Sequence, residues 1–309
     1  MRIGVTGGSG FIGSHVVDHL VATGHDVTVL DRVPPHRADV GYRRTDITDG
    51  LSVHRGVRGC DAIFHLAAVS DVNEAFQRPA AAVAVNVLGT ANVWEAARDC
   101  GVGRVLLAST VWVYGASCGV EPLTEDAPVD LSRAGHLYTS TKLSAELVAQ
   151  SYSQLYGLPF TILRYGIPFG PRMREELVIA RFVRMARAGH LITIQGDGSQ
   201  VRNYVYVEDL AAAHVLALGA AAENEVFSLD GAEPISVRRI VEAVRDAVGG
   251  SVGVEFVPAR AGDYAGRAVS PEKARRVLGW APATPFEEGV RRYIEWLDEE
   301  DRAAVGAGS

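Results

Sequence analysis

Apolar positions in the first half of the chain form two alternating patterns. Short, nearly continuous apolar runs are typical of strands buried on both faces, and the longer segments between them repeat with the spacing of a helix. We expect strands at residues 2–6, 25–31, 62–66, 104–109 and 160–164, and helices at 13–23, 79–98 and 138–156. This alternation predicts an α/β fold with a parallel sheet that helices cover on both faces.

The pattern changes after residue 164. Glycine and proline gather at 166–171, which marks a break in the alternation of strands and helices. Further helices are expected at 177–188, 236–248 and 271–278. We expect a first domain of residues 1–165, to which 204–222 return, and a smaller second domain of residues 166–203 and 223–309.

Composition excludes several classes of protein. The 309 residues are 48% hydrophobic, with a mean hydropathy of +0.09 and a net charge of −7, and the charges are interspersed rather than gathered in a basic nucleic-acid-binding surface. Apolar runs stay below the about 18 residues that a membrane span needs, and the N-terminus lacks a secretory signal pattern. The cysteines (Cys60, Cys100 and Cys118) and the histidines lack metal-ligand spacing, so we expect no metal, and reduced thiols in a cytoplasmic protein.

A glycine-rich loop is the first candidate for chemistry. Residues 6–13 read Thr-Gly-Gly-Ser-Gly-Phe-Ile-Gly, directly after the first strand and at the start of the first helix. Two glycine registers fit, starting at Gly7 or at Gly8, and both include Gly10 and Gly13. Such glycines allow a tight turn and a close approach of the backbone to a pyrophosphate, whose charge meets the helix N-terminus. The loop therefore predicts a dinucleotide site.

Two acidic residues that follow the glycine-rich loop in the sequence refine the choice of dinucleotide. Asp31 ends the second strand, where a carboxylate accepts hydrogen bonds from the adenosine ribose and repels a 2′-phosphate, which favours NAD over NADP. Arg32 follows at once and would suit that phosphate, so NADP stays open. Asp46 and Ile47 would flank the adenine, with a plain turn as the alternative.

Tyr138 and Lys142 are the candidate catalytic pair. Residues four apart share one face of a helix, and a neighbouring ammonium lowers the pKa of a phenol from its ordinary value of about 10, so that it can act as a base. Ser109 and Thr110 close the preceding strand, where side chains reach the ligand crevice of an open α/β sheet. A local bond from such a hydroxyl to the backbone is the alternative.

Three arginines are candidates for binding a diphosphate, because the guanidinium fork suits phosphate oxygens. They are Arg164, Arg202 and Arg260, each of which has a surface or structural role as the alternative. His65 ends a buried strand, a position more typical of a packing residue than of a catalyst.

These stretches together resemble the extended short-chain dehydrogenase/reductase family, in particular its nucleotide-sugar epimerases and dehydratases such as the UDP-glucose and UDP-glucuronate 4-epimerases. The matching stretches are residues 6–13, 65–68, 86–90, 114–115, 138–142, 260–263 and 278–282. The resemblance implies a Rossmann-type domain that binds NAD, and a smaller C-terminal domain that binds a nucleotide diphospho-sugar, with a UDP-sugar favoured.

The resemblance also implies roles for individual residues. Tyr138 matches the catalytic base, Lys142 its partner, and Thr110 the catalytic hydroxyl. The implied substrate contacts are Thr110, Arg202, Arg260 and Asp263. The implied cofactor contacts are Gly7, Gly10, Phe11, Ile12, Gly13, Asp31, Arg32, Asp46, Ile47, Leu66, Ala67, Ala68, Asn86, Ser109, Tyr138, Lys142, Tyr165 and Ile167.

Two departures from the family pattern bear on the reaction. Dehydratases carry Asp-Glu directly after the catalytic Thr, and decarboxylases carry a Glu in that segment, whereas this chain has Val111 and Trp112. Neither side chain transfers protons in that role, so dehydration and decarboxylation are disfavoured. Many relatives also have Asn, in contact with the sugar nucleotide, where this chain has Ile167.

We therefore expect an NAD-dependent nucleotide-sugar 4-epimerase that works through a 4-keto intermediate. The alternatives are an NAD(P)-dependent reductase of keto-sugar nucleotides and, less favoured, a 4,6-dehydratase or a non-catalytic dinucleotide sensor. A homodimer is expected through the helices around 80–98 and 138–156, whose apolar positions exceed one core-facing stripe. Burial of these positions within the monomer is the alternative.

Overall fold

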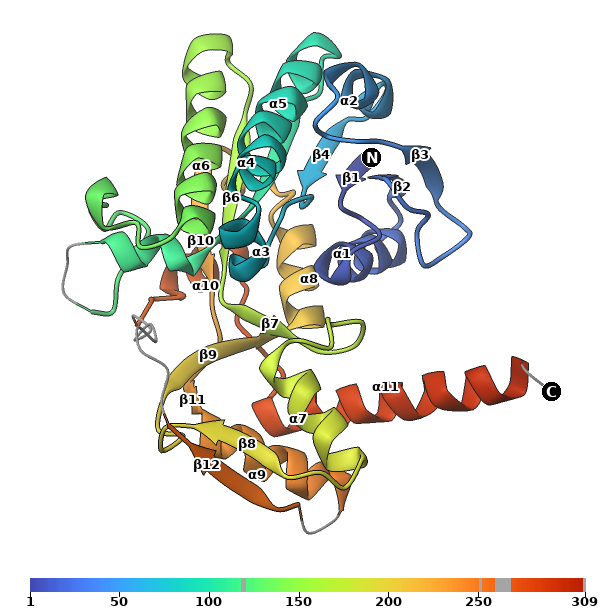
Figure 1. The fold of residues 1–309 in the computed structure, drawn as a ribbon. Helices are drawn as coiled ribbons and strands as arrows, with labels where there is room; N and C mark the ends of the chain where they lie inside the picture. The colour runs from blue at the N-terminus through green and yellow to red at the C-terminus, as the bar shows by residue number, and fades with distance from the viewer. Residues whose placement is uncertain (118–120, 250–251, 259–267, 308–309) are drawn as a thin grey trace. The chain divides into compact units, whose positions relative to one another are not determined.

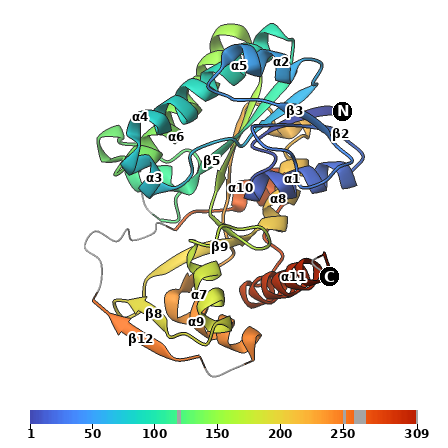
Figure 2. The ribbon, with the colours of Figure 1, turned by 45° about the vertical axis from the view of Figure 1, so that its right-hand side comes forward.

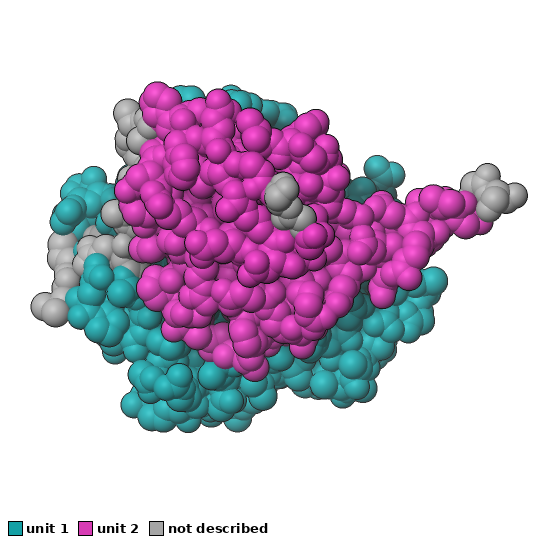
Figure 3. Space-filling model, turned by 90° about the horizontal axis from the view of Figure 1, so that it is seen from below, with its two compact units in different colours: residues 1–165, 211–229, 267–281 teal, residues 166–210, 230–266, 282–309 magenta. Residues whose placement is uncertain are grey.

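The computed structural model describes residues 1–309 except 118–120, 250–251, 259–267 and 308–309. Contacts between residues divide the chain into two compact units, which Figure 3 distinguishes by colour. Unit 1 comprises residues 1–165, 211–229 and 267–281, and unit 2 comprises residues 166–210, 230–266 and 282–309.

Unit 1 is built on a seven-stranded parallel sheet of strand order β10-β6-β5-β4-β1-β2-β3 (Figure 1). The strands are β1 (Arg2–Thr6), β2 (Asp26–Asp31), β3 (Gly41–Arg44), β4 (Ala62–His65), β5 (Arg104–Thr110), β6 (Phe160–Tyr165) and β10 (Glu225–Leu229). The strand order reverses beside β1, which is the position where open α/β sheets bind ligands.

Helices cover both faces of this sheet, as neighbouring residues of one strand show. Ile63 belongs to a core cluster with residues of α2, α5 and α6, whereas the ring of Phe64 contacts His214 of α8 (Figure 2). Successive strand residues point to opposite faces, so these helices lie on opposite sides of the sheet. The helices of this unit are α1 (Phe11–Ala22), α2 (Gly50–Val57), α3 (Val72–Gln77), α4 (Pro79–Val83), α5 (Gly89–Asp99), α6 (Leu137–Tyr156), α8 (Val207–Leu216, in unit 1 from residue 211) and α10 (Glu272–Leu278).

The predicted doubly wound parallel sheet is confirmed, and its early elements begin and end within about two residues of their expected bounds. The expected helix at 79–98 is interrupted, because residues Ala84–Leu88 form a π-helical turn between α4 and α5. β3 and α2 were not predicted from the pattern. All four residues of β3 are exposed, so this edge strand gives no apolar signal, and α2 begins where the Asp49 side chain accepts from the N–H groups of Leu51 and Ser52.

The described residues of unit 2 form two small sheets. β9 pairs in parallel with β7 and antiparallel with β11, and β8 pairs in parallel with β12. The aromatic rings of Phe169, Tyr204, Tyr206 and Phe286 pack together in its interior. The strands are β7 (Ile167–Phe169), β8 (Ile192–Gln195), β9 (Val201–Tyr206), β11 (Pro234–Ser236) and β12 (Val254–Val257), and the helices are α7 (Val178–Arg187), α9 (Val237–Val248) and α11 (Phe286–Ala307).

The contact-based boundaries differ from the expected ones in two places. Residues 204–210 belong to unit 2, because β9 pairs with β7 and β11. Residues 223–229 and 267–281 belong to unit 1, because β10 pairs with β6 and α10 packs on β10. Short strands such as β10 have too few alternating positions to reveal their partner from the sequence.

Three further observations bear on the expected class of protein. In the described ranges, no helix has both the length and the apolar character needed to cross a membrane. The same ranges hold no cluster of His, Cys, Asp and Glu that fits a metal ion. Cys60 is a buried free thiol and Cys100 a partly buried one, while Cys118 lies outside the described residues.

Candidate active site

The glycine loop lies tightly against the segment that follows β4. Gly7 has a φ of +71°, and a Cβ there would lie 2.7 Å from the Ala67 nitrogen. A Cβ on Gly13 would lie 2.0 Å from the Gly7 carbonyl oxygen. Side chains at these two positions are therefore excluded, as a close approach of backbone to a phosphate requires. Gly10 precedes α1 without a side-chain cap, so the N-terminus of α1, at Phe11 and Ile12, can receive an anion.

Asp31 connects the end of β2 to this loop. Its carboxylate accepts from the Ser9 N–H at 3.2 Å, the Arg32 N–H at 2.6 Å and the Val33 N–H at 3.3 Å. A carboxylate has about four acceptor positions, which leaves capacity for ribose hydroxyls. The loop and Asp31 thus fit a dinucleotide, with the phosphates at α1 and the ribose at Asp31. The Arg32 side chain is exposed beside them.

Asp46 and Ile47 follow β3. The Asp46 carboxylate accepts from the Thr48 hydroxyl at 2.7 Å and from the Thr48 N–H at 2.9 Å, and these bonds hold the pKa of Asp46 below its usual range. Ile47 is buried against Gly89, where an added Cβ would lie 2.7 Å from the Ile47 side chain. The Asp46 carboxylate thus closes a turn.

The N-terminus of α6 carries the candidate catalytic pair. His136 caps this helix, since its Nδ1 accepts from the Thr139 N–H at 3.3 Å. Lys142 is buried and its Nζ donates to the Ala108 carbonyl oxygen of β5 at 3.0 Å. Burial lowers the pKa of Lys142 to about 8, and the negative charge of Glu146 opposes that shift. The ammonium is thus held at the sheet, one turn of helix from Tyr138.

Thr110 ends β5 beside this pair. Its Oγ1 accepts from the Trp112 N–H at 3.2 Å, which leaves the hydroxyl proton able to donate to a ligand. The ring of Trp112 meets the ring of Tyr138 edge to face, with their centroids 6.3 Å apart. Thr110 is also the register partner of Tyr165, which ends β6. Thr110, Tyr138 and Lys142 therefore gather at the carboxyl ends of β5 and β6.

Tyr165 is buried in this region, and its hydroxyl lies 2.5 Å from Nε2 of His214. Burial, and secondarily the nearby Tyr138, raise the pKa of Tyr165 well above its ordinary value. Tyr165 therefore stays a neutral phenol. Ile167, two residues further on, begins β7 of unit 2 and pairs with Tyr204.

Sequence reasoning did not find the buried ion pair of Glu146 and Arg164. Arg164 donates Nε–H to Glu146 Oε1 at 3.0 Å and Nη2–H to Glu146 Oε2 at 2.8 Å, and its Nη1 donates to the Tyr114 hydroxyl at 3.0 Å. Ser109 donates to Glu146 Oε1 at 2.5 Å. Arg164 therefore pairs with Glu146 inside unit 1, which is the structural role given as the alternative to phosphate binding. The spacing of Glu146, four residues after Lys142, indicates only a shared helix face and does not identify Arg164 as its partner.

Asn86 joins the segment after β4 to α6. It lies in the π-helical turn and is buried, and its Nδ2 donates to the Thr141 hydroxyl oxygen at 3.0 Å. The segment after β4 is fixed to β1, because the Leu66 N–H donates to the Thr6 carbonyl oxygen at 3.1 Å and the Ala67 N–H to the Thr6 hydroxyl oxygen at 3.3 Å. Ala68 continues this segment.

The candidate substrate contacts of unit 2 are only partly described. Arg202 lies in β9 opposite Ile235, and its Nη1 donates to the Val201 carbonyl oxygen at 2.7 Å. Arg260 and Asp263 lie outside the described residues.

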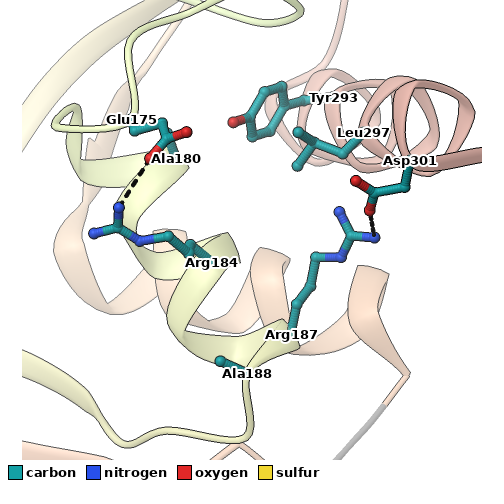
Figure 4. A pocket seen from close by; sticks show the side chains of 8 residues that line it. All are labelled: Glu175, Ala180, Arg184, Arg187, Ala188, Tyr293, Leu297 and Asp301. Carbon is teal, nitrogen blue, oxygen red and sulfur yellow. Dashed lines mark hydrogen bonds and ion pairs between the residues drawn. The ribbon is translucent and has the colours of Figure 1, made fainter. Parts of the chain in front are cut away.

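A hollow of about 360 Å³ lies in unit 2 between α7 and α11 (Figure 4). None of the predicted site residues lines it. Its two arginines are already paired: Arg184 with Glu175 at 3.0 Å, and Arg187 with Asp298 at 2.6 Å and with Asp301 at 2.9 Å. The hollow therefore offers no unpaired guanidinium to a phosphate.

Comparison with known proteins gives the family. Residues 3–229 match the NAD dependent epimerase/dehydratase family. The chain is 35% identical to a UDP-glucose 4-epimerase of Mycolicibacterium smegmatis, over 96% of this chain and 98% of that protein. It resembles the crystal structure of a Thermus thermophilus UDP-glucose 4-epimerase in complex with NAD, with a TM-score of 0.86, 33% identity, and coverage of 96% of this chain and 99% of that chain.

A dehydratase is also among the similar structures. It is a double mutant of a dTDP-glucose 4,6-dehydratase from Streptomyces venezuelae with NAD bound, with a TM-score of 0.88, 32% identity, and coverage of 97% of both chains. The predicted family resemblance and the predicted cofactor are confirmed by these matches. The chain belongs to the NAD-dependent epimerase/dehydratase family and is an NAD-dependent enzyme.

Proposed function

We propose that this enzyme is a nucleotide-sugar 4-epimerase that works through a transient 4-keto intermediate, with a UDP-sugar as its substrate. The observation that carries the proposal is the gathering of Thr110, Tyr138 and Lys142 at the carboxyl ends of β5 and β6. The names of the similar 4-epimerases support the choice of a UDP-sugar.

The chain's own residues hold and move the proton of the C4 hydroxyl. Tyr138, as a phenolate, takes that proton, and the buried ammonium of Lys142 favours the phenolate form. The Thr110 hydroxyl donates a hydrogen bond to the reacting oxygen. When bound, NAD would supply the hydride chemistry, with removal of the hydride from one face of C4 and its return to the opposite face of the 4-keto sugar. Tyr138 then gives the proton back to the oxygen at C4, so the net reaction is redox-neutral.

The residues after Thr110 argue against water elimination. Val111 and Trp112 begin the 3₁₀ turn that follows β5, and neither side chain is an acid or base at neutral pH. A 4,6-dehydratase must both remove and deliver a proton at the sugar after the oxidation at C4. The similarity to a dehydratase therefore supports the shared oxidation step rather than the elimination.

For the substrate's other end, we assign the diphosphate to Arg202 and Arg260, because a guanidinium binds phosphate oxygens in pairs. We assign the nucleotide ribose to Asp263. These assignments rest on the positions of the three residues in the family pattern.

We also propose a homodimer that forms through the helices α4 and α6. Val83 of α4, Leu88 of the π-helical turn, and Leu147 and Leu155 of α6 are exposed in this chain. These elements pack against one another within unit 1, so their exposed side chains lie on neighbouring helices. The alternative, burial of these positions within the monomer, does not apply to these four.

The test is incubation of the purified protein with UDP-, TDP- and GDP-sugars, without added cofactor, followed by proton NMR. We expect a C4 epimer from one UDP-sugar, and none from the variant Tyr138→Phe, which keeps the ring but lacks the proton-transferring oxygen. The loss should be at least about 100-fold. NAD binding should persist in the variant.

Two other results would contradict the proposal. Conversion that starts only when NAD(P)H is supplied, with stoichiometric consumption, would identify a keto-sugar reductase. Unchanged epimerisation by Tyr138→Phe would remove Tyr138 from the catalytic role.

A further inference from the structure

A chain of buried side-chain hydrogen bonds runs through unit 1 from the glycine loop toward α6. Its first half begins at Thr6, which precedes Gly7, and passes through His65 at the end of β4. The Thr6 hydroxyl lies 2.8 Å from His65 Nδ1, and His65 Nε2 lies 3.0 Å from the Thr90 hydroxyl. Thr90 donates in turn to the Asn86 carbonyl oxygen at 2.6 Å. These four linked residues are all buried.

The acceptors in this half determine where its protons lie. A hydroxyl has one proton, and Thr90 gives it to a carbonyl oxygen, which can only accept. His65 Nε2 must therefore carry a proton and donate it to Thr90. In a neutral imidazole Nδ1 is then unprotonated and accepts from Thr6. Burial, and secondarily the charge of Lys142, lower the pKa of His65 to about 3, so the ring is neutral at physiological pH.

The second half of the chain joins Asn86 to α6. Asn86 Nδ2 donates to the Thr141 hydroxyl oxygen at 3.0 Å, and the Thr141 hydroxyl donates to the Tyr138 carbonyl oxygen at 2.8 Å. The Asn86 side chain also exchanges two hydrogen bonds with the backbone of Val69, at 2.8 and 3.0 Å. Donors and acceptors thus match at every link, which makes the network rigid rather than costly.

We propose that His65 and Thr90 are positioning residues that hold Tyr138 and Lys142 in register with the glycine loop. The catalytic consequence rests on the proposed function, because it requires the loop and Tyr138 to serve one bound pair of cofactor and substrate. The structural basis is separate from it. The chain of hydrogen bonds begins at Thr6, one residue before Gly7. It reaches α6 at Thr141, one residue before Lys142.

A substitution at Thr90 can interrupt the chain of hydrogen bonds while it changes little else in the structure. Thr90→Val removes the hydroxyl and keeps the shape of the side chain, whereas Thr90→Ser keeps the hydroxyl. Thr161→Val is the matched control. Thr161 is equally buried, and its hydroxyl donates to the Ala222 carbonyl oxygen at 2.6 Å, outside this chain. Each valine variant therefore loses one buried bond from a hydroxyl to a backbone carbonyl, and Thr90→Val also loses the bond from His65 Nε2 that is under test.

The first readout does not depend on activity. The sequence contains two lysines, so an NMR spectrum of lysine-labelled protein reports Lys142 and, as an internal reference, Lys273. We expect Thr90→Val to shift the Lys142 signal and to leave Lys273 in place. Thr90→Ser and Thr161→Val should leave both signals in place, because a loss of stability alone does not move Lys142.

The second readout is kinetic, with the substrate that the panel of nucleotide sugars identifies. A misplacement of about 1 Å can cost about 100-fold in rate, so we expect kcat of Thr90→Val to fall by about 10- to 100-fold. KM should change little, Thr90→Ser should restore kcat, and Thr161→Val should keep it.

Several results would overturn the proposal. These are an unmoved Lys142 signal in Thr90→Val, an equal shift in Thr161→Val, or nitrogen chemical shifts of the wild-type protein that put the His65 proton on Nδ1. The last measurement needs no variant and so stands even if Thr90→Val does not fold. If the wild-type protein converts no nucleotide sugar, the proposed function fails, while the Lys142 signal and the His65 tautomer still decide on the positioning chain.

Discussion

A lysine at position 142 has a property that an arginine there would lack. The chain contains 30 lysines and arginines, but Lys142 and Lys273 are its two lysines. A guanidinium stays charged in proteins, whereas the pKa of a buried ammonium responds to its surroundings. Burial brings the pKa of Lys142 to about 8. The Lys142 amine is therefore protonated at neutral pH and loses its proton slightly above neutral pH.

Lys142 should titrate near pH 8 in the folded protein, in an NMR pH series of lysine-labelled protein. The variant Lys142→Met assigns the signal by removing it. Burial sets the pKa of the folded state below the about 10.4 of an unfolded chain, so the unfolded chain holds more protons between these values. The contribution of this group to the free energy of unfolding should therefore rise with pH from about 8 to about 10.4.

Below pH 8, Lys142 is protonated in both the folded and the unfolded chain. The burial of its charge then lowers the free energy of unfolding most. Urea unfolding at pH 7 and pH 9.5 measures this, and Lys142→Met should show a smaller gain across that interval than the wild-type protein. A Lys142 signal that titrates near pH 10.4 would contradict the prediction.

Other residues show the limit of inference from sequence. The spacing of Tyr138 and Lys142 predicted a shared helix face, because that depends on local geometry alone. Arg164 and Ser109 both donate hydrogen bonds to Glu146. These bonds depend on the packing of α6 against β5 and β6. No local pattern in the sequence reports that packing, so the phosphate-binding and the structural role of Arg164 both stayed open.

Among elements, helices and strands with strong periodicity were predicted well. α6 begins and ends within about one residue of its expected bounds. The π-helical turn at Ala84–Leu88 was missed, since it alters the helix without changing its apolar pattern. α11 was also missed, although its buried residues Phe286, Val290, Tyr293 and Ile294 follow the spacing of a helix.

The exposed apolar side chains of α4 and α6 lead to a prediction about assembly. Wild-type protein should have a mass in solution of about twice its 33.0 kDa, and Leu147→Asp should reduce it to the monomer. Leu147 is 53% exposed in this chain, so the substitution should leave the protomer folded. Burial of a leucine is worth about 1.5–3 kcal/mol, and a two-fold interface contains it twice.

Light scattering coupled to size exclusion measures these masses. Leu51→Asp is the matched control, because Leu51 is exposed on α2, which is not a helix of the proposed interface, and this variant should stay dimeric. A monomeric wild-type protein, or a Leu147→Asp variant that keeps the larger mass, would contradict the homodimer.

At the scale of the whole molecule, the two units differed in how far the sequence predicted them. Unit 1 repeats one motif of strand and helix, whose pattern predicts both the elements and a parallel sheet. Several strands of unit 2, such as β7 and β11, are too short to show an alternation. The elements of unit 1, which carry most of the candidate cofactor residues, were therefore predictable in more detail than those of unit 2.

The transfer of hydrogen at C4 tests the proposed chemistry most directly. The UDP-sugar that the panel identifies is prepared with deuterium at C4 and incubated with the wild-type enzyme, without added cofactor, and the product is observed by NMR and mass spectrometry. We predict a C4 epimer that retains the deuterium at C4, because the same hydride leaves and returns within one active site. Deuterium lost to water, or product formed only with added NAD(P)H, would contradict an epimerase that works through a 4-keto intermediate.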